Sequence, residues 1–370
     1  MTFDVAIIGG GIAGLALAND IKDRGYSVVV IEKGNYPRHK VCGEYISMES
    51  HNYLQNICPA LKQLNLPAIT NFKITTGNSK AFNTPLGLGG FGVSRYLLEE
   101  LLFEEAKKRG VVFLLDTKAK EVKRDNDLYT IKTGTENIFS KLVCNSSGRR
   151  SNLEVKERSE EVKGANYVGI KYHVKLKRDP NLIEIHNFPG GYCGISNIED
   201  DKACLCYIVN SKKLNEAKNS ISELEKNSLF KNKQLKKIFN EAEFLFDEPV
   251  TISGINFRIK KPVNDGSFFL GDSAGSIAPI TGNGMSIGLR SASVLASLVT
   301  DHFSGKISGL QLQNSYNDFW NKEFSTRIRL SRHFQKLSEF SFLTAITINL
   351  FKAFPLLARG IIKLTHGKPF

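Results

Sequence analysis

The stretch Gly9-Gly10-Gly11-Ile12-Ala13-Gly14 decides the fold of this chain. It follows an apolar, β-branched run at residues 4–8 and leads into residues 15–24, whose composition favours a helix that ends before Gly25. A second apolar run at residues 27–31 comes next, and Glu32 follows it directly. This order predicts a strand–turn–helix–strand unit of a parallel sheet, and the glycine spacing in that context indicates that the turn binds a dinucleotide.

The residue types of the turn suit phosphate binding. Gly9 permits the tight turn, Gly11 lets the backbone approach a pyrophosphate, and Gly14 lets the helix pack closely on the strand. The start of the helix, with Ile12 and Ala13, presents unpaired N–H groups and a partial positive charge to the phosphates. The alternative is a glycine-rich turn without a ligand, which the flanking strands make the weaker interpretation.

Three charged residues extend this predicted site. Glu32 can accept hydrogen bonds from the ribose hydroxyls, and Lys33 lies beside it. Arg95 stands just ahead of an amphipathic helix predicted at residues 96–109, from which it could reach the phosphates of a cofactor. An ordinary surface arginine is the competing interpretation.

A second informative segment is residues 36–44, which read YPRHKVCGE. Its basic side chains, with Arg38 among them, make an electropositive loop that could contact phosphates or an anionic ring. Cys42 lies near these cations, which favours the thiolate, and it is followed by Gly43 and Glu44. We take Cys42 and Glu44 as candidate catalytic residues, although a surface loop with a buried cysteine fits the residues equally well.

A third segment places small residues after a strand predicted at residues 267–270. Gly271-Asp272 ends that strand, and an aspartate there can bind the hydroxyls of a sugar-like chain. Pro279 and Gly282-Asn283-Gly284-Met285 then lead into a long predicted helix. The N–H groups at this second glycine-rich helix start can face a developing negative charge. A simple strand–loop–helix joint is the alternative.

Composition narrows the class of protein. The 370 residues have a hydrophobic fraction of 41%, enough for a sizeable core. The formal net charge is +13, but no helix-turn-helix, zinc-finger or RNA-binding signature accompanies it, and we expect no nucleic-acid partner. The six cysteines form no CxxC pair and no secretory leader precedes the first strand, so reduced thiols and a cytoplasmic protein are expected. The histidines and cysteines lack metal-site spacing, and no metal is predicted.

The pattern along the chain predicts an α/β fold with three parts. Residues 1–163 and 260–303 form a discontinuous nucleotide-binding domain that includes some substrate-side segments. Residues 164–259 contain several strand-like runs around a lysine-rich helical stretch, and they predict a substrate-binding sheet domain. Residues 304–370 form a C-terminal helical region.

The last part of that region is strongly apolar from residue 340 onward. Lys352, Pro355 and Arg359 interrupt the run, so a spanning helix is not expected. The simpler interpretation is a set of helices packed on the substrate domain. The alternative is a basic amphipathic surface that touches a membrane peripherally or admits a lipid.

Five stretches, in this order, resemble the geranylgeranyl reductase family, which belongs to the larger group of flavoproteins that includes aromatic hydroxylases of the para-hydroxybenzoate hydroxylase type. They are GGGIAG at 9–14, EKGNYPRHKVCGEYIS at 32–47, GVSRYLLEELLFEEAKKRG at 92–110, NSSGRRS at 145–151 and FLGDSAGSIAPITGNGMSIGLRSA at 269–292. The resemblance spans roughly residues 1–303. PRHKVCGE is the element that separates the reductases from the wider group.

The resemblance implies a Rossmann-type FAD-binding domain interleaved with an antiparallel-sheet substrate domain, with the flavin between them. It implies that Arg38 and Arg95 pair with the phosphate region and that Cys42 and Gly43 lie near the isoalloxazine ring. Asp272 would bind the ribityl chain, and residues 282–285 would cradle the pyrimidine edge. Members of the family typically reduce isolated C=C bonds of prenyl chains, with hydride from flavin N5 added to one carbon and a proton to the other.

Two departures from the family pattern bear on the reaction. Ser147-Gly148 stands where the wider group usually has Asp-Gly, which weakens a hydroxylase that uses NADPH. Gly191-Tyr192-Cys193-Gly194 stands where the reductases carry a segment rich in aromatic residues, which favours a substrate other than the usual prenyl lipid.

Three functions are therefore weighed. The leading hypothesis is an FAD-dependent oxidoreductase that reduces or dehydrogenates a hydrophobic, lipid-like substrate, with NADPH, NADH or a protein as the source of electrons. The second is a flavin monooxygenase that hydroxylates an aromatic or polyketide product. The third is a flavin electron carrier without turnover.

Overall fold

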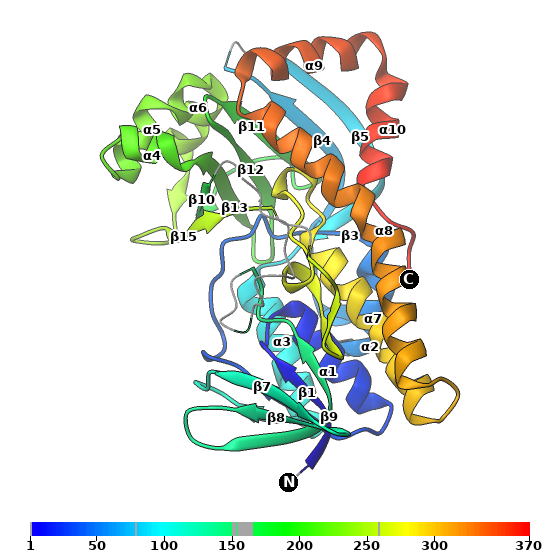
Figure 1. The fold of residues 1–370 in the computed structure, drawn as a ribbon. Coiled ribbons are helices and arrows are strands. Elements are labelled where there is room, and N and C mark those ends of the chain that lie inside the picture. The colour runs from blue at the N-terminus through cyan, green and yellow to red at the C-terminus, as the bar shows by residue number, and fades with distance from the viewer. Residues whose placement is uncertain (1, 78–79, 150–152, 154–165, 258–259) are drawn as a thin grey trace.

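The computed structural model describes residues 2–77, 80–149, 153, 166–257 and 260–370 (Figure 1). The chain forms two sheets, one above the other in the view of Figure 1, with helices packed on both. Long C-terminal helices run along the side of the molecule and over its top. The predicted α/β class, with a nucleotide-binding domain and a second sheet, is confirmed.

The first sheet has a parallel centre with the strand order β6-β2-β1-β9-β17. Its strands are β1 (Thr2–Ile8), β2 (Val28–Ile31), β6 (Val112–Leu114), β7 (Glu121–Asp125), β8 (Leu128–Lys132), β9 (Asn137–Asn145), β16 (Val263–Asn264) and β17 (Ser267–Phe269). Side chains of β1 alternate between two cores: Val5 and Ile7 face one, and Ala6 and Ile8 face the other. A continuous apolar strand is expected where both faces of a parallel sheet are covered.

Three helices cover one face of this sheet: α1 (Ile12–Asp23), α3 (Arg95–Lys108) and α7 (Gly284–Phe303). Beside the other face, β7 pairs antiparallel with β8, and β8 pairs antiparallel with β9. Helices α1 and α7 pack together, and their first turns lie at the carboxyl-end edge of β1. In open α/β sheets, ligands bind at this edge.

The second sheet has the strand order β14-β10-β13-β12-β11-β4-β5-β3, with β15 paired to β10. Its strands are β3 (Tyr45–Ser47), β4 (Ala68–Thr75), β5 (Ala81–Gly92), β10 (Tyr167–Lys175), β11 (Leu182–Phe188), β12 (Gly191–Asn197), β13 (Lys202–Asn210), β14 (Glu243–Phe244) and β15 (Val250–Ile255). The lysine-rich helical stretch forms α4 (Ser211–Glu216), α5 (Ile221–Asn227) and α6 (Lys233–Glu241), which pack on one face of the sheet.

This sheet is larger than the predicted substrate domain of residues 164–259. Strands β3, β4 and β5 lie within the first 163 residues, yet they pair into the second sheet. Strand β4 joins it through a parallel pairing with β11, in which Phe72 lies opposite Ile183. The sequence predicted substrate-side segments within residues 1–163 but did not identify them, because a parallel pairing between segments so far apart leaves no turn signal between them.

The remaining helices are α2 (His51–Ile57), α8 (Gly309–Ser338), α9 (Ser341–Ala353) and α10 (Pro355–Thr365). Helix α8 buries Tyr316, Trp320, Phe324 and Ile328, spaced by four residues, against the first core. Helices α9 and α10 then pack on β5 and β11 of the second sheet. Within the described residues no single helix is long and apolar enough to cross a membrane; α9 and α10 meet that criterion only as a pair, and the pair is bent by 114°.

Candidate cofactor and active site

The predicted glycine turn connects β1 to α1. Gly9 has a φ of +99°, and a Cβ there would lie 2.7 Å from the backbone carbon of Ser146. A Cβ on Gly14 would collide with the carbonyl oxygen of Gly9. Helix α1 is capped by Gly11 with no side-chain hydrogen bond, and its first turn holds no acidic residue. The N–H groups at this helix start therefore face outward to accept an anion.

Basic side chains surround Gly11. The Nζ of Lys40 and an Nη of Arg95 lie 3.7 and 3.8 Å from the position that a Cβ on Gly11 would take. Arg38 joins them through its contact with the carbonyl of Gly10, an Nη–O distance of 3.2 Å. This arrangement places positive charge at the turn that the sequence predicted to bind phosphates.

A carboxylate that the sequence did not reveal balances these cations. Glu99, on α3, is fully buried and pairs with Arg95, with Lys40 at 3.4 Å and with the Nε of Arg38 at 3.5 Å. Burial by itself would raise the pKa of Glu99, but the charges of Arg95 and Lys40 hold it below its usual range. Glu99 lies four residues after Arg95, and this spacing on a predicted helix was the available signal.

Glu32 directly follows β2, as predicted, and its carboxylate already accepts hydrogen bonds from groups of the protein. It accepts hydrogen bonds from the Gly10 N–H at 2.7 Å, from the Gly34 N–H at 3.1 Å and from Arg38 at 2.8 Å. Binding of a ribose by Glu32 stays a prediction, and it would require Arg38 to share this carboxylate. Lys33 next to it is exposed.

Cys42 connects the electropositive loop to the third segment. Its Sγ lies 3.9 Å from the Sδ of Met285, in the first turn of α7, and accepts a hydrogen bond from the Glu44 N–H at 3.4 Å. Gly43, which lies between Cys42 and Glu44 in the chain, is exposed. Cys42 and Met285, two predicted site residues, thus lie in contact although they are 243 positions apart in the chain.

Glu44 lies beneath that loop in a buried ionic cluster. Its carboxylate contacts the Nζ of Lys171 at 2.5 Å and the Nε2 of His173 at 2.6 Å, and it accepts the Arg95 N–H at 2.8 Å. Glu44 and Lys171 have no exposed surface. Burial would raise the pKa of Glu44, but the hydrogen bond from His173 and the charge of Lys171 lower it. Glu44 thus holds the loop in place from below, and its predicted catalytic role stays a prediction.

The sequence analysis did not identify Lys171 or His173. Both lie on β10 two residues apart, so they point to the same face of the sheet. A lysine and a histidine on one face of an otherwise apolar strand are unusual unless a buried partner compensates them, and this was the available signal. Cys204 lies close enough for its sulfur, Glu44 and His173 to offer ligand atoms within 4.8 Å of one another. The Lys171 ammonium competes for the same carboxylate, so the cluster is explained as an ion pair.

The third segment approaches the same edge. Gly271 packs against Ala13 of α1, and Asp272 pairs with the Nε of Arg149 at 3.0 Å, so the predicted ribityl contact would require this pair to open. Arg150 and Ser151, which follow Arg149 in the motif NSSGRRS, lie outside the described residues. Pro279 is exposed at the start of a short 3-10 helix, Pro279–Thr281.

Like α1, helix α7 begins without a side-chain hydrogen bond to its first N–H groups. Gly282 adopts a left-handed conformation with a φ of +71°, and Gly284 is exposed at the first helical position. Asn283 caps the helix without a side-chain hydrogen bond to it, and the first turn has no acidic residue. The Asn283 amide donates to the carbonyl of Thr365, while its buried Oδ1 has no hydrogen-bond partner among the described residues.

These features fit FAD. Two helix starts with uncapped N–H groups meet at one edge of the parallel sheet, and a basic cluster surrounds the glycine turn of α1. The diphosphate of FAD needs the first, and the electron-rich pyrimidine edge of a flavin suits the second. Gly9, Gly11, Ile12, Ala13 and Gly14 would hold the diphosphate, and residues 282–285 would hold the ring.

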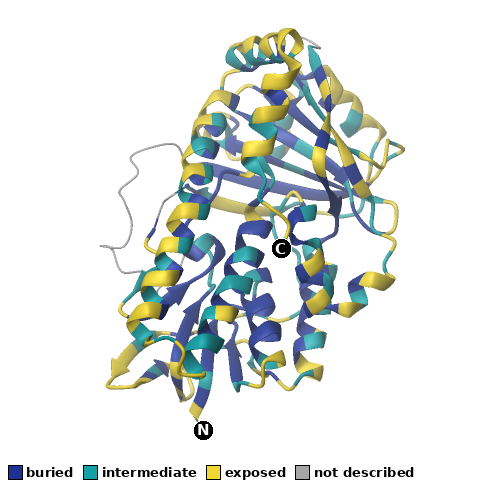
Figure 2. Cartoon of the chain, turned by 90° about the vertical axis from the view of Figure 1, so that its right-hand side faces the viewer, coloured by how far each residue is buried: buried dark blue, intermediate teal, exposed yellow. Residues whose placement is uncertain are grey.

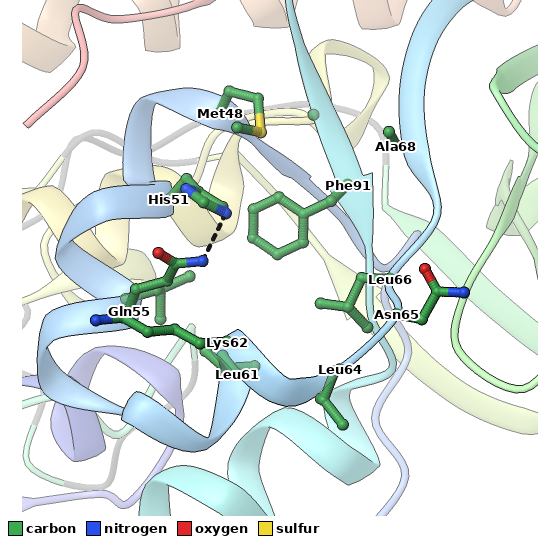
Figure 3. Close-up of a pocket in the computed structure, with 12 residues that line it drawn as sticks. Met48, His51, Gln55, Leu61, Lys62, Leu64, Asn65, Leu66, Ala68 and Phe91 are labelled. Atoms are coloured by element: carbon green, nitrogen blue, oxygen red, sulfur yellow. Dashed lines mark hydrogen bonds between the residues drawn. The ribbon is translucent and has the colours of Figure 1, made fainter.

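A separate cavity of about 240 Å³ lies between α2 and the end of β5 (Figure 3). In Figure 3 the ring of Phe91 and the side chain of Leu66 point into it, with His51 and Gln55 joined by a hydrogen bond at its edge. None of its lining residues belongs to the cofactor site residues predicted from the sequence. Its lining combines apolar and polar side chains, and it lies next to the β3 strand that follows Glu44.

Comparison with known proteins agrees with this site. The family model described as FAD binding domain matches residues 2–318. Conditioned medium factor receptor 1 of Dictyostelium discoideum is 23% identical over 363 residues, which cover 89% of this chain and 69% of that protein. Digeranylgeranylglycerophospholipid reductase 2 of Methanothermobacter thermautotrophicus is 23% identical, with 91% and 88% covered.

A solved structure, the flavin-dependent brominase Bmp2, superimposes with a TM-score of 0.81 at 19% identity and covers 99% of this chain and 93% of the brominase. At this level of identity the likeness concerns the fold. The family model covers most of the chain, and the glycine turn, the basic cluster and the start of α7 lie within it. The protein is an FAD-dependent enzyme, and its chain belongs to the FAD binding domain family.

Proposed function

We propose that this enzyme is a reductase that adds hydrogen across a C=C bond of a hydrophobic, lipid-like substrate. The observation that carries the proposal is the position of Cys42, whose sulfur lies 3.9 Å from Met285 at the start of α7. Cys42 belongs to the PRHKVCGE segment, which marks the reductases within the wider group of flavoproteins. The similarity to an archaeal digeranylgeranylglycerophospholipid reductase over 91% of the chain supports the same substrate class.

The residues of the chain have distinct tasks in this proposal. Bound reduced FAD would supply the hydride for one carbon of the double bond. The Cys42 side chain lies beside the start of α7 and would deliver a proton to the other carbon. Glu44, fixed by Lys171 and His173, positions the Cys42 loop without touching the substrate.

The first test is anaerobic reoxidation of the reduced holoenzyme. We would reduce the FAD-loaded protein with dithionite, remove the excess, and add a total lipid extract of the source cells in detergent while recording flavin absorbance. We expect the oxidised spectrum to return without oxygen and a lipid of the extract to gain two hydrogen atoms by mass spectrometry. A flavin that stays reduced until air enters would refute the proposal. If the flavin is reoxidised without oxygen, we would next compare NADPH, NADH and a reduced ferredoxin as the source of electrons.

The variant Cys42→Ser tests the assignment of the proton donor. A serine hydroxyl is a far weaker acid than a thiol, so we expect lipid-dependent reoxidation to slow by about 100-fold while FAD stays bound. Cys58→Ala is the matched control, because Cys58 is buried in the first core away from the cofactor segments. Equal reoxidation rates for Cys42→Ser and the wild type would remove Cys42 from the mechanism.

A second candidate is a flavin monooxygenase or a related oxygen-dependent enzyme. The observation in its favour is the fold similarity to a flavin-dependent brominase along nearly the whole chain. It predicts that reoxidation needs oxygen and that an aromatic substrate gains an oxygen or halogen atom. The same anaerobic experiment separates the two functions, because only the reductase transfers its electrons to the added lipid.

A further inference from the structure

Helix α9 is built with its apolar side facing outward. Thr344 and Ile348 are buried against the second sheet, while Phe342, Ile346 and Leu350 alternate with them on the opposite side. These three side chains are 74%, 48% and 43% exposed. Their spacing of four residues gives one continuous stripe, and a surface helix of a globular protein normally shows polar residues there.

Helix α10 extends this apolar surface. Leu356, Leu357 and Leu364 are 79%, 44% and 62% exposed, and only Ala358 is buried. Phe354, 59% exposed, lies between the two helices where the chain bends. We call the pair Ser341–Ala353 and Pro355–Thr365 the α9–α10 pair. In Figure 2 the helix at the top of the molecule, which is α9 in Figure 1, carries much exposed surface.

The charged side chains within residues 340–370 have one sign. Residues 340–370 contain no aspartate or glutamate, and the lysines and arginines among them are all exposed. These are Lys352, Arg359, Lys363 and Lys368. Exposed apolar side chains flanked by cations suit the headgroup region of an anionic bilayer, where the apolar groups enter the acyl boundary and the cations meet phosphates.

We propose that the α9–α10 pair is a docking surface for an anionic lipid bilayer and lies in the plane of its interface. By its rise per residue α9 is about 20 Å long and α10 about 17 Å, which is short of a hydrocarbon core of about 30 Å. The chain bends by 114° between the two helices, so they do not form one straight spanning segment. Phe354 and Leu356, at the bend, would enter deepest.

The alternative occupant is a second copy of the same chain. A two-fold contact through this face would bring identical cations together, in a chain that already carries a net charge of +13. Like charges at an interface oppose association, whereas an anionic bilayer attracts all four. Charge complementarity therefore favours the bilayer.

The α9–α10 pair is attached to the second sheet by buried apolar contacts. Phe351 packs on Phe82 of β5 with ring centroids 5.5 Å apart, and Ile348 and Ala358 complete a small core there. Docking through this pair would bring the second sheet toward the bilayer. The inference rests on exposure and charge alone and does not require the proposed reductase function.

The test uses the full-length FAD-loaded protein and flotation with unilamellar vesicles. One set of vesicles is phosphatidylcholine, and the other is an equimolar mixture of phosphatidylcholine and phosphatidylglycerol. We expect binding to the anionic vesicles that weakens as salt is added. Absence of binding to the anionic vesicles at low salt would overturn the proposal.

Two sets of variants locate the contact. Phe342→Ser/Leu356→Ser removes the two most exposed apolar side chains of the pair, and we expect the partition coefficient to fall about tenfold or more. Lys352→Gln/Arg359→Gln/Lys363→Gln should lower it by on the order of a hundredfold at low salt. Both substitutions involve exposed positions, so the fold and the flavin spectrum should be unchanged.

Matched controls change the same properties elsewhere. Leu310→Ser removes an apolar side chain that is 67% exposed at the start of α8, far from α9 in Figure 1. Lys233→Gln/Lys236→Gln/Lys237→Gln removes three exposed charges from α6. If either control lost as much binding as its α9–α10 counterpart, attraction would be general and the proposal wrong. Dimerisation that Phe342→Ser/Leu356→Ser abolished, with no vesicle binding, would assign the face to a second copy instead.

Discussion

The carboxylate of Glu44 lies 2.6 Å from the Nε2 of His173, although the two residues are 129 positions apart in the chain. The same carboxylate binds Lys171, and none of the three side chains is more than 5% exposed. The loop that carries Cys42 is thus fixed by an ionic contact with β10 of the second sheet.

Glu44→Gln should destabilise the protein by about 3–5 kcal/mol, because it leaves the Lys171 ammonium buried without a negative partner. Urea unfolding followed by circular dichroism, with FAD in fixed excess, measures this change. Adding Lys171→Met should recover part of the loss. Glu216→Gln is the control: Glu216 pairs with Lys213 at the surface, and its loss should cost less than about 1 kcal/mol. A similar small loss for Glu44→Gln would mean that the cluster is dispensable.

Gly11→Ala and Gly14→Ala should separate cofactor binding from folding. A Cβ on Gly11 would meet only the ends of Lys40 and Arg95 at ordinary contact distance, so the stability of the apoprotein should change by about 1 kcal/mol or less. FAD affinity should fall at least about tenfold, because the added methyl occupies the approach of the phosphates.

Gly14→Ala should instead unfold or strongly destabilise the protein, since its Cβ collides with the Gly9 backbone. Gly87→Ala, where no atom lies within 4 Å of the new Cβ, serves as control. Fluorescence titration with FAD and thermal unfolding of the apoprotein measure the two effects. Full FAD affinity in Gly11→Ala would contradict the assignment of the phosphate site.

His186 should make stability fall as pH decreases. It is 1% exposed on β11, and burial, with Lys73 and Arg178 nearby and Glu184 opposing them, lowers its pKa from 6.5 to about 4. Between these values the unfolded chain binds a proton that the folded protein does not, so stability present above pH 6.5 is lost as pH falls toward about 4.

This one group can account for up to about 3 kcal/mol over that window. His186→Asn, which does not titrate, should flatten the dependence of the urea midpoint on pH. His333→Gln, at an exposed position of α8, should leave it as in the wild type. An unchanged slope in His186→Asn would assign the acid sensitivity to other groups.

FAD affinity should fall as pH rises through about 8. Burial, assisted by Arg95 and Arg38 and opposed by Glu99, lowers the pKa of Lys40 to about 8, and only the protonated amine attracts the diphosphate. Lys40→Met should bind FAD several-fold more weakly at neutral pH and lose this dependence. Lys108→Met, at an exposed position of α3, should keep it. Titrations across this pH range measure both, and a wild-type affinity independent of pH would contradict the role of Lys40.

Local patterns in the sequence predicted the backbone features of the candidate cofactor site. Gly9, Gly11 and Gly14 stand where the turn from β1 to α1 requires them, and the start of α7 follows Gly282 within a few residues. Such features can be recognised in the sequence because backbone conformation and helix capping depend on neighbours along the chain. The strands and helix predicted within residues 4–31, and the helix predicted at residues 96–109, are likewise formed close to their expected bounds.

By itself, then, the sequence determined the nucleotide-binding turn, the α/β class and the family resemblance. Only the tertiary structure decided that β3, β4 and β5 join the second sheet, that Glu99 balances the cations around Gly11, and that the apolar stripe of α9 faces outward. It also decided that Glu44 meets Lys171 and His173. The physical reason is that these features depend on which distant surfaces pack together. The sequence can show that a charged residue on a buried strand needs a partner of opposite charge. Only the packing of the sheets selects which residue that partner is.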